Sequence, residues 1–212
     1  MAVQALISDF GGVLTSPLAG AFAAFEADSG VPLAELGRAM AAESQRLGGN
    51  PLFELETGRM TEAEFLSSIG AQLTRRLGRE VSLDGFGERY FADLTPNAPM
   101  IAFMRELRAR GLRLAICTNN VREWEHRWRA MVPVQEIFEV VVDSAHVGMR
   151  KPERGIYELT LERLGVAAGD ALFVDDIEIN CDAARALGLR TVWFRSTEQA
   201  IAEIETALAE PA

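Results

Sequence analysis

The sequence has little of several residue types on which whole classes of protein depend. Among 212 residues there are two cysteines and two histidines, and no apolar stretch approaches the ~18 residues of a transmembrane helix. Cys117 and Cys181 cannot form a disulfide framework, and their scarcity fits a reducing compartment. The N-terminus lacks the basic segment and the long apolar core of a signal peptide, so we expect a cytoplasmic protein without a membrane segment.

Positive charge is also scarce. The chain carries 21 Lys and Arg against 31 Asp and Glu, which gives a formal net charge of −10. Binding to nucleic acid or to an anionic membrane depends on clustered Lys and Arg, so this balance argues against both partners. If the substrate is an anion, the chain has to create a positive potential locally, against its own overall field. The sequence leaves the oligomeric state open.

Five short apolar runs with β-branched residues alternate with segments of helical periodicity. Such runs are typical of the buried strands of a parallel sheet, and the alternation predicts right-handed crossovers through helices. The predicted strands lie at residues 3–7, 112–117, 138–142, 171–174 and 190–194. A chain of this length is long enough for one such α/β domain together with a smaller insert.

Residues 15–95 interrupt this alternation, because they contain no apolar run of comparable strength. Helical spacing there predicts four helices, and a capping-box pair, Thr61 and Glu64, precedes the third. The four lie at about 18–28, 33–47, 61–77 and 83–92. We therefore expect a Rossmann-like α/β core at 1–14 and 96–212, with a helical cap at 15–95 over the carboxyl ends of the strands, where open α/β sheets bind ligands.

Polar side chains follow the predicted strands at the points where they end. The first strand is followed by Asp9, the second by Thr118 and Asn119, and the fourth by Asp175 and Asp176. Because parallel strands bring these ends to one edge of the sheet, we expect the side chains to lie close together. Carboxylates at close range raise one another's pKa unless a cation lies among them, and oxygen ligands beside phosphate favour Mg²⁺.

These residue types suit phosphoryl transfer. A carboxylate that the metal ion does not use fully can act as a nucleophile and form an aspartyl-phosphate. The transfer then needs positioning of the phosphate and neutralisation of its charge. Lys151, the Thr118 hydroxyl and the backbone N–H groups around residues 10–12 can supply both, and Gly11 and Gly12 let the backbone approach the phosphate closely.

In these residues the sequence resembles the haloacid dehalogenase superfamily of hydrolases. The four motifs of the superfamily are matched in order by residues 9–14, 118–119, 151–152 and 175–180. The resemblance covers the whole chain, and a long gap between the first two motifs implies a helical cap inserted after the first strand. The branches most similar to this sequence are the glucose-1-phosphate-type phosphatases and the phosphatase-like N-terminal domain of epoxide hydrolases.

The resemblance implies a metal centre at the first and fourth motifs. It implies that Asp9 is both the nucleophile and a ligand of Mg²⁺. The carbonyl oxygen of Gly11 and the carboxylate of Asp176 are the further ligands that it implies, with Asp175 beside them.

The resemblance also implies a phosphate site. It implies that Thr118 and Asn119 hold phosphate oxygens, together with the backbone at Phe10–Gly12. By the same resemblance, Lys151 binds the phosphate and neutralises the attacking carboxylate, and Asn180 orients either Lys151 or the acidic pair.

One position departs from the superfamily's phosphatase pattern. Most of its phosphatases carry a second Asp two residues after the nucleophile as general acid and base, whereas this chain has Gly11 there. A general acid typically contributes about 10²–10⁴ in rate. Three alternatives could compensate for the missing acid. Another group or water can donate the proton, or the leaving group can be intrinsically good, as in a sugar 1-phosphate or an acyl phosphate. In dehalogenation the leaving halide needs no proton at all.

We expect Mg²⁺-dependent hydrolysis of a small phosphometabolite, with a sugar phosphate favoured because of Gly11. The main alternative is a metal-free 2-haloacid dehalogenase with the same nucleophile. The dehalogenases of the superfamily have uncharged residues where this chain has Asp175 and Asp176, and a carboxylate pair without a cation is unfavourable. A catalytically weak binding or regulatory protein is a further alternative, although a decayed site would be expected to lose several of the motif residues that remain here.

Outside the motifs, two features bear on substrate binding. Trp124 and Trp128 stand four residues apart, a spacing more typical of a packing face than of a substrate platform. In the cap, Arg46, Glu56 and Arg59 could each reach the substrate, but such residues are common on helix surfaces.

Overall fold

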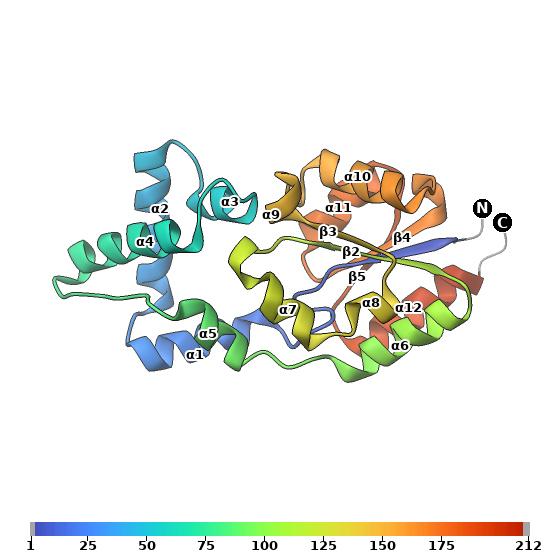
Figure 1. Ribbon diagram of the computed structural model, residues 1–212, viewed down its shortest axis with the longest axis horizontal. Helices are drawn as coiled ribbons and strands as arrows, with labels where there is room; N and C mark the ends of the chain where they lie inside the picture. Colours follow the sequence, from blue (N-terminus) through green and yellow to red (C-terminus); the bar gives the residue numbers. More distant parts are fainter. Residues whose placement is uncertain (1–2, 210–212) are drawn as a thin grey trace.

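The five apolar runs form a parallel sheet, seen in Figure 1 at the right-hand end of an elongated molecule. The computed structural model describes residues 3–209. The strands are β1 (Ala5–Ser8), β2 (Arg113–Thr118), β3 (Val140–Asp143), β4 (Ala171–Asp175) and β5 (Arg190–Trp193). They are arranged in the order β3-β2-β1-β4-β5, and all neighbours are parallel. The predicted α/β fold is therefore confirmed.

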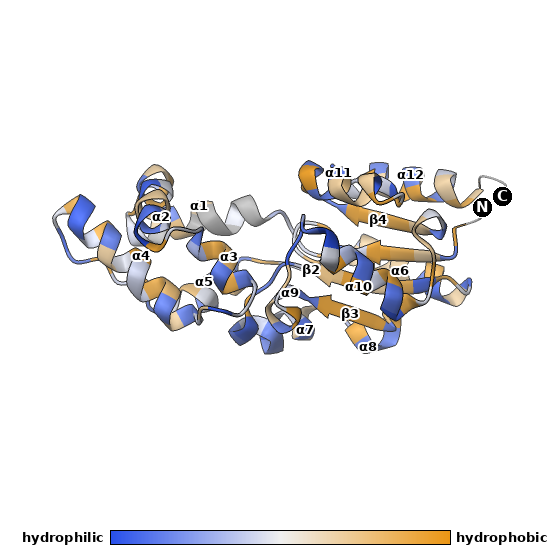
Figure 2. Ribbon diagram, turned by 90° about the horizontal axis from the view of Figure 1, so that it is seen from above, coloured by the Kyte–Doolittle hydropathy of each residue, from blue (hydrophilic) through white to orange (hydrophobic). Residues whose placement is uncertain are grey.

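Burial on both faces explains why the strands look like continuous apolar runs in the sequence. Every residue of β1 and β4 is buried, and Figure 2 shows the strands among the most hydrophobic segments. Ser8, the last residue of β1, lies opposite Val174 of β4. Asp9 and Asp175, the next residues along the chain, are therefore brought to neighbouring positions at the carboxyl edge of the sheet.

Helices cover both faces of the sheet, which gives a three-layer core (Figure 1). One face is covered by α10 (Arg154–Leu164) and α11 (Glu178–Ala186). The other is covered by α6 (Ala98–Ala109), α7 (Glu125–Met131), α8 (Val134–Ile137) and α12 (Thr197–Ala209). The short elements η1 (Arg122–Trp124), α9 (Ser144–Val147) and η2 (Ala168–Asp170) lie in the connections. Within residues 3–209, no helix combines the length and the apolar character needed to cross a bilayer.

Five further helices lie between β1 and α6 in the sequence and at the other end of the molecule in Figure 1. They are α1 (Leu18–Ser29), α2 (Leu33–Leu47), α3 (Pro51–Glu56), α4 (Glu62–Leu77) and α5 (Phe86–Ala92). Four correspond to predicted helices, and the predicted capping box of α4 is present. The sequence analysis missed α3, because six residues are too few to display a helical period.

These helices have a hydrophobic cluster of their own, separate from the two clusters that flank the sheet. Its buried members are Phe25, Val31, Ala39, Ile69, Leu73, Val81 and Leu83. A core of their own supports our interpretation of residues 15–95 as a cap domain, and we keep those boundaries as a proposal.

Two paired segments connect the helices to the sheet. Thr15 and Pro96 form an isolated antiparallel bridge, and Ser16 N donates a hydrogen bond to Thr95 O at 2.8 Å. Asn97 N donates to Leu14 O at 2.9 Å. Any rotation of the helices relative to the sheet therefore has to pass through these two adjacent chain segments.

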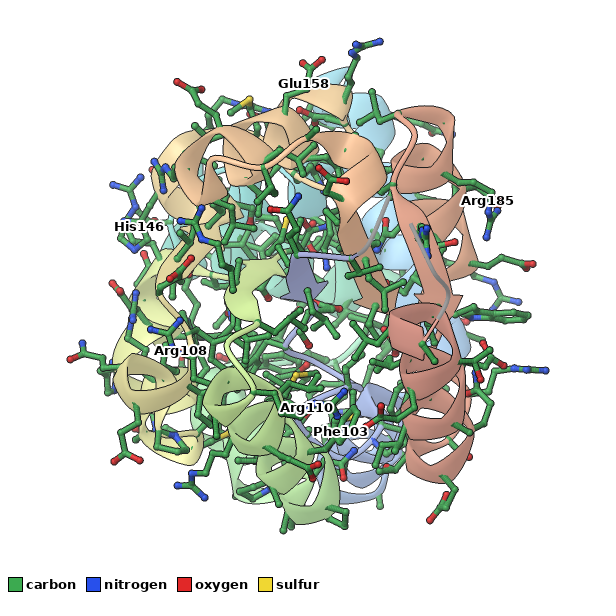
Figure 3. The ribbon with its side chains drawn as sticks, turned by 90° about the vertical axis from the view of Figure 1, so that its right-hand side faces the viewer. Phe103, Arg108, Arg110, His146, Glu158 and Arg185 are labelled. Atoms are coloured by element: carbon green, nitrogen blue, oxygen red, sulfur yellow. The ribbon has the colours of Figure 1, made fainter. Side chains whose placement is uncertain are left out.

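Charged side chains surround the sheet end of the molecule, as the labelled Glu158 and Arg185 illustrate in Figure 3. Some pair across elements: Arg110 lies 2.6 Å from Glu205, and both side chains are about two-fifths exposed. Exposed pairs of this kind contribute about 0–1 kcal/mol. The stability of the fold therefore rests on the apolar clusters rather than on these ion pairs.

Candidate active site

Lys151 lies between two carboxylates at the carboxyl edge of the sheet. Its Nζ is 2.7 Å from Asp9 Oδ1 and 2.7 Å from Asp175 Oδ2, and the lysine side chain is 1% exposed. Burial by itself lowers the pKa of Lys151, but the charges of Asp175 and Asp9 outweigh it and hold that pKa above its ordinary value. Lys151 is the single lysine of the sequence. It provides a permanent positive charge within an acidic protein, at a position where it could interact with a bound anion.

Asp9 is held in place by the sheet and by two donors. Its backbone N–H donates to Val174 O at 2.8 Å, which extends the β1–β4 pairing by one residue. Its Oδ1 accepts a hydrogen bond from Phe10 N at 2.7 Å and also contacts Lys151. Both donors engage the same oxygen, so Oδ2 is the oxygen left for chemistry.

The structure gathers the three predicted carboxylates. One oxygen each from Asp9, Asp175 and Asp176 can be chosen so that all lie within 4.8 Å of one another. Burial, followed by the neighbouring carboxylates, raises the pKa of Asp9 despite Lys151, and burial and Asp175 raise the pKa of Asp176 to about 6. A divalent cation would relieve this repulsion, and an all-oxygen donor set suits Mg²⁺. The residues present therefore fit the predicted metal ion.

Asp175 is engaged at both of its oxygens. Oδ2 accepts from Lys151, while Oδ1 accepts from Asn180 Nδ2 at 3.0 Å and from Ile177 N at 2.8 Å. The resemblance implied that Asn180 orients Lys151 or the acidic pair, and its hydrogen bond to Asp175 is a contact of this kind. Because its lone pairs are used in this way, Asp175 is better suited to hold Lys151 than to bind a metal ion directly, whereas Asp9 and Asp176 retain oxygens for it.

The side-chain amide of Asn119 is hydrogen-bonded to the loop that carries Lys151. Its Nδ2 donates to Lys151 O at 2.9 Å, and its Oδ1 accepts from Lys151 N at 2.8 Å. The amide therefore fixes the backbone of Lys151 and uses both of its ends to do so. Thr118, the last residue of β2, is 1% exposed and, like Gly11, lines the cavity described below. Phosphate binding by Thr118 and Asn119 stays a prediction.

Gly12 makes room for Asp176. Its φ is +76°, and a Cβ built at this position would lie 2.2 Å from Asp176 Oδ2. We expect Gly12→Ala to displace that carboxylate and to weaken the apparent affinity for Mg²⁺ by about 10–100-fold. The measurement is the Mg²⁺ concentration that gives half-maximal activity.

Gly48→Ala is the matched control, because Gly48 also has a left-handed φ, +71°, but nothing within 4 Å of its added Cβ. We expect this variant to need the same Mg²⁺ concentration as the wild type. An equal shift in both variants would mean that backbone strain, and not the contact with Asp176, controls the metal site.

A cavity of about 690 Å³ opens beside these residues, between the cap helices and the strand ends. Phe10, Gly11, Thr118 and Asn119 line its sheet side, and most of the remaining lining consists of apolar side chains of the cap helices. The sequence analysis did not single out these cap residues, because their helical spacing marks them equally well as core.

The two tryptophans separate in the structure. Trp128 is fully buried, with its ring centroid 5.1 Å from that of Phe10, as expected for a packing face. Trp124 lines the cavity and stacks on Tyr90 of α5, with the ring centroids 5.1 Å apart. They diverge because η1 ends at Trp124 and α7 begins after it, so the two residues do not share one regular helix.

The three charged cap residues considered as substrate contacts are paired with other groups. Arg46 pairs with Glu43, and Arg59 pairs with Glu54. Glu56 lines the cavity, but its carboxylate is 2.6 Å from Arg150 Nε, with both side chains less than one-sixth exposed. The Glu56–Arg150 pair joins α3 to the loop that carries Lys151.

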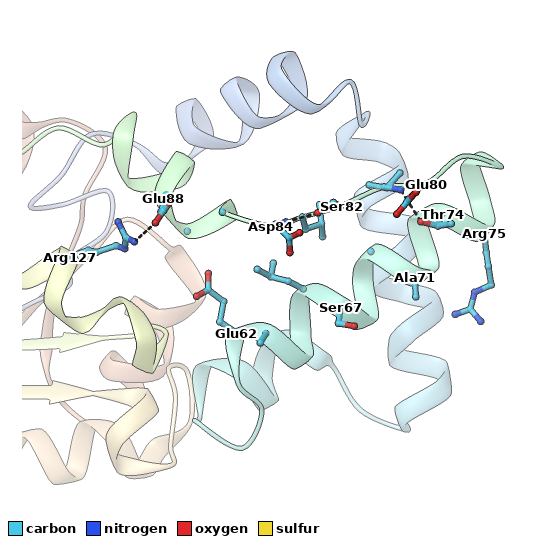
Figure 4. Close-up of a pocket in the computed structure, with 17 residues that line it drawn as sticks. Glu62, Ser67, Ala71, Thr74, Arg75, Glu80, Ser82, Asp84, Glu88 and Arg127 are labelled. Carbon is cyan, nitrogen blue, oxygen red and sulfur yellow. Dashed lines mark hydrogen bonds and ion pairs between the residues drawn. The ribbon is translucent and has the colours of Figure 1, made fainter.

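A larger hollow, of about 1,200 Å³, lies along α4 and reaches Arg127 of α7 (Figure 4). It runs between α4 and the segment at 80–88, where Glu88 and Arg127 form an ion pair at 3.2 Å. Its lining does not include Asp9, Lys151 or Asp176. The hollow is therefore not where the gathered carboxylates can act.

The comparison with known families agrees with the fold and the motifs. The family model of the haloacid dehalogenase-like hydrolases matches residues 3–188. This range is most of the chain, so the protein belongs to the haloacid dehalogenase-like hydrolases.

Two relatives illustrate the similarity in sequence. The chain is 29% identical to "Sesquiterpene phosphatase astK" of Aspergillus oryzae, over 88% of this chain and 87% of the relative. It is 26% identical to "Bifunctional epoxide hydrolase 2" of Sus scrofa, over 97% of this chain but 39% of that protein. The chain spans 19% to 39% of the length of several curated relatives that it matches.

Two solved structures illustrate the similarity in fold. The HAD family enzyme bt-2542 of Bacteroides thetaiotaomicron, in complex with magnesium and inorganic phosphate, has a TM-score of 0.67 at 24% identity, over 92% of this chain and 96% of that chain. The L-2-haloacid dehalogenase of Xanthobacter autotrophicus has a TM-score of 0.63 at 20% identity, over 99% and 85%. At such identities the likeness shows the fold alone.

Proposed function

We propose that the protein is a Mg²⁺-dependent phosphatase that hydrolyses small phosphate monoesters through an aspartyl-phosphate on Asp9. The observation that carries the proposal is the buried Lys151 between Asp9 and Asp175, with Asp176 beside them. Asp9, Asp176 and the carbonyl oxygen of Gly11 are the ligands that we assign to Mg²⁺. The bound ion would neutralise charge on the carboxylates and on the phosphate.

Each residue of the site has its own role in the proposed reaction. The Asp9 carboxylate attacks phosphorus, the bond from phosphorus to the leaving oxygen breaks, and water then hydrolyses the aspartyl-phosphate to release phosphate. Lys151 keeps its charge throughout and holds Asp9 in position, while Asn119 and Asp175 hold Lys151. Gly11 supplies no acid, so the departing oxygen takes its proton from water or another group.

The acidic pair favours this reaction over dehalogenation. A metal-free dehalogenase would have to keep Asp9, Asp175 and Asp176 together with only Lys151 to balance them, which is unfavourable at the observed separations. Relatives named as phosphatases support the same choice. A sugar phosphate stays among the candidate substrates. A cytoplasmic location also stays a proposal, and the two buried free thiols support it.

Removal of Mg²⁺ tests the proposed function. We expect phosphate release from 4-nitrophenyl phosphate to fall by about 10²–10³-fold in EDTA, because the gathered carboxylates then repel the substrate. Added Mg²⁺ should restore the rate. Chloride release from 2-chloropropionate in EDTA, without phosphate release in Mg²⁺, would instead establish a dehalogenase, and turnover of neither substrate would favour a binding protein.

A further inference from the structure

The cavity beside Asp9 is continuous with the proposed phosphate site. Gly11, Thr118 and Asn119 line it at the sheet, so a phosphate bound at Asp9 would direct its ester group into the cavity. Beyond these residues the lining is mostly aliphatic and aromatic, and it includes Leu36 and Met40 of α2 and Phe65 of α4. A volume of about 690 Å³ lies within the range of pockets that enclose small organic ligands.

The carboxylates and the side-chain amides of this cavity are already engaged. Glu62 Oε1 accepts the indole N–H of Trp124 at 2.8 Å, and Glu56 is paired with Arg150. Asn119 binds the backbone of Lys151, and Asn120 Oδ1 accepts from Val121 N at 2.9 Å. A polyhydroxylated ester group would therefore lose its bonds to water and find few partners here, which is unfavourable.

The charges of the lining also exclude a second anionic group on the substrate. Among the described residues that line the cavity there are two glutamates and no Lys, Arg or His. A carboxylate or a second phosphate on the ester group would meet Glu56 and Glu62 without a cation of the lining to pair with. The chemistry of the cavity thus admits uncharged, apolar groups.

We infer that the substrate is a phosphate monoester of an apolar alcohol, whose hydrocarbon part fills the cavity between the cap helices and the strand ends. This inference rests on the proposed phosphatase function and narrows its substrate class. Burial of hydrocarbon next to Leu36, Met40 and Phe65 removes apolar surface from water on both sides of the contact, and this provides the binding energy.

A series of n-alkyl phosphates, from ethyl to octyl, tests the inference on the wild-type protein in Mg²⁺. The leaving alcohols differ little in acidity, so the series isolates the contribution of the hydrocarbon. We expect kcat/KM to rise about three- to fourfold per added methylene, and by about 10³-fold from ethyl to octyl phosphate. Glucose 1-phosphate should be a poorer substrate than octyl phosphate, and a flat series or the reverse preference would overturn the inference.

Variants locate the effect in the cavity. We expect Leu36→Gln and Met40→Gln, which replace half-buried lining residues of α2, to lower kcat/KM for octyl phosphate at least about tenfold. The loss of kcat/KM for ethyl phosphate should be several-fold smaller, because its short chain reaches less of this lining. Leu47→Gln is the matched control, because Leu47 lies on the same helix, is 39% exposed and is not part of the lining. Equal losses on both substrates, or in all three variants, would contradict the assignment.

A binding measurement separates this inference from the proposed function. If 4-nitrophenyl phosphate is not hydrolysed in Mg²⁺, the proposed function fails, and calorimetry with ethyl- and octylphosphonate still tests the cavity. We expect octylphosphonate to bind at least about 100-fold more tightly than ethylphosphonate. Equal affinities would overturn the inference about the cavity, whatever the activity.

Discussion

We expect Asp9→Asn to lower turnover by at least about 10⁴-fold while the protein stays folded. An amide cannot attack phosphorus as a carboxylate does, so the aspartyl-phosphate would not form. The change preserves shape, and the amide oxygen can still accept the hydrogen bond from Phe10 N that Asp9 Oδ1 accepts now. The measurements are phosphate release under single-turnover conditions, covalent phosphate in acid-quenched samples and the thermal unfolding curve.

Asp143→Asn is the matched control for this variant. Asp143 ends β3 at the same edge of the sheet, and its Oδ1 accepts from Ala145 N at 3.0 Å, a contact that Asn can keep. Asp143 is not part of the group formed by Asp9, Asp175 and Asp176, so we expect activity within a few-fold of the wild type. Near-normal turnover in Asp9→Asn would refute Asp9 as the nucleophile.

Lys151→Met should affect both activity and stability. The substitution leaves Asp9 and Asp175 buried with no cation between them. Breaking a buried ion pair by removing one partner typically costs about 3–5 kcal/mol in the free energy of unfolding. We expect a loss of this size in urea unfolding at pH 8, together with a drop in turnover of about 10³-fold or more, since a positive charge at the phosphate would also be lost.

The loss of stability in Lys151→Met should depend on pH and on Mg²⁺. Burial already raises the pKa of Asp9, and Lys151 opposes that rise. Without Lys151 the folded-state pKa of Asp9 lies further above its unfolded value, so ionisation of this carboxylate destabilises the fold. The deficit should therefore be small at about pH 4 and grow as the pH rises through the raised pKa of Asp9. Mg²⁺ should recover part of the stability at pH 8, because it offsets the same repulsion.

Arg110→Met is the control for a surface cation. Both side chains of its ion pair with Glu205 are about two-fifths exposed. We therefore expect the free energy of unfolding to change by less than about 1 kcal/mol, and this change should not depend on Mg²⁺. A deficit in Lys151→Met that is equally small, or independent of pH, would show that Lys151 does not balance the two carboxylates. Lys151→Arg is not a conservative alternative, because a planar guanidinium cannot replace a compact ammonium between two oxygens.

The strand ends were predictable because parallel-sheet geometry leaves little freedom. Apolar runs that stop at Asp9, Thr118 and Asp175 indicate both the strands and the edge at which those residues meet. The resemblance placed Lys151 with them, and in the structure its ammonium group contacts the carboxylates of Asp9 and Asp175. The side-chain partners were harder to predict: Asn119 binds the backbone of Lys151, an arrangement that depends on how two loops approach each other.

The sequence by itself determined the parallel α/β fold, the helical insert and the set of carboxylates that needs a cation, because periodicity and strand ends are local properties of the chain. Only the tertiary structure decided what surrounds the phosphate site. Leu36, Phe65 and Trp124 come from separate elements, and each would satisfy a core pattern equally well. Whether such residues fill a core or line an open cavity depends on how the helices pack over the sheet, which no local pattern specifies. The apolar cavity, and with it the substrate class that we infer, therefore emerged only from the folded chain.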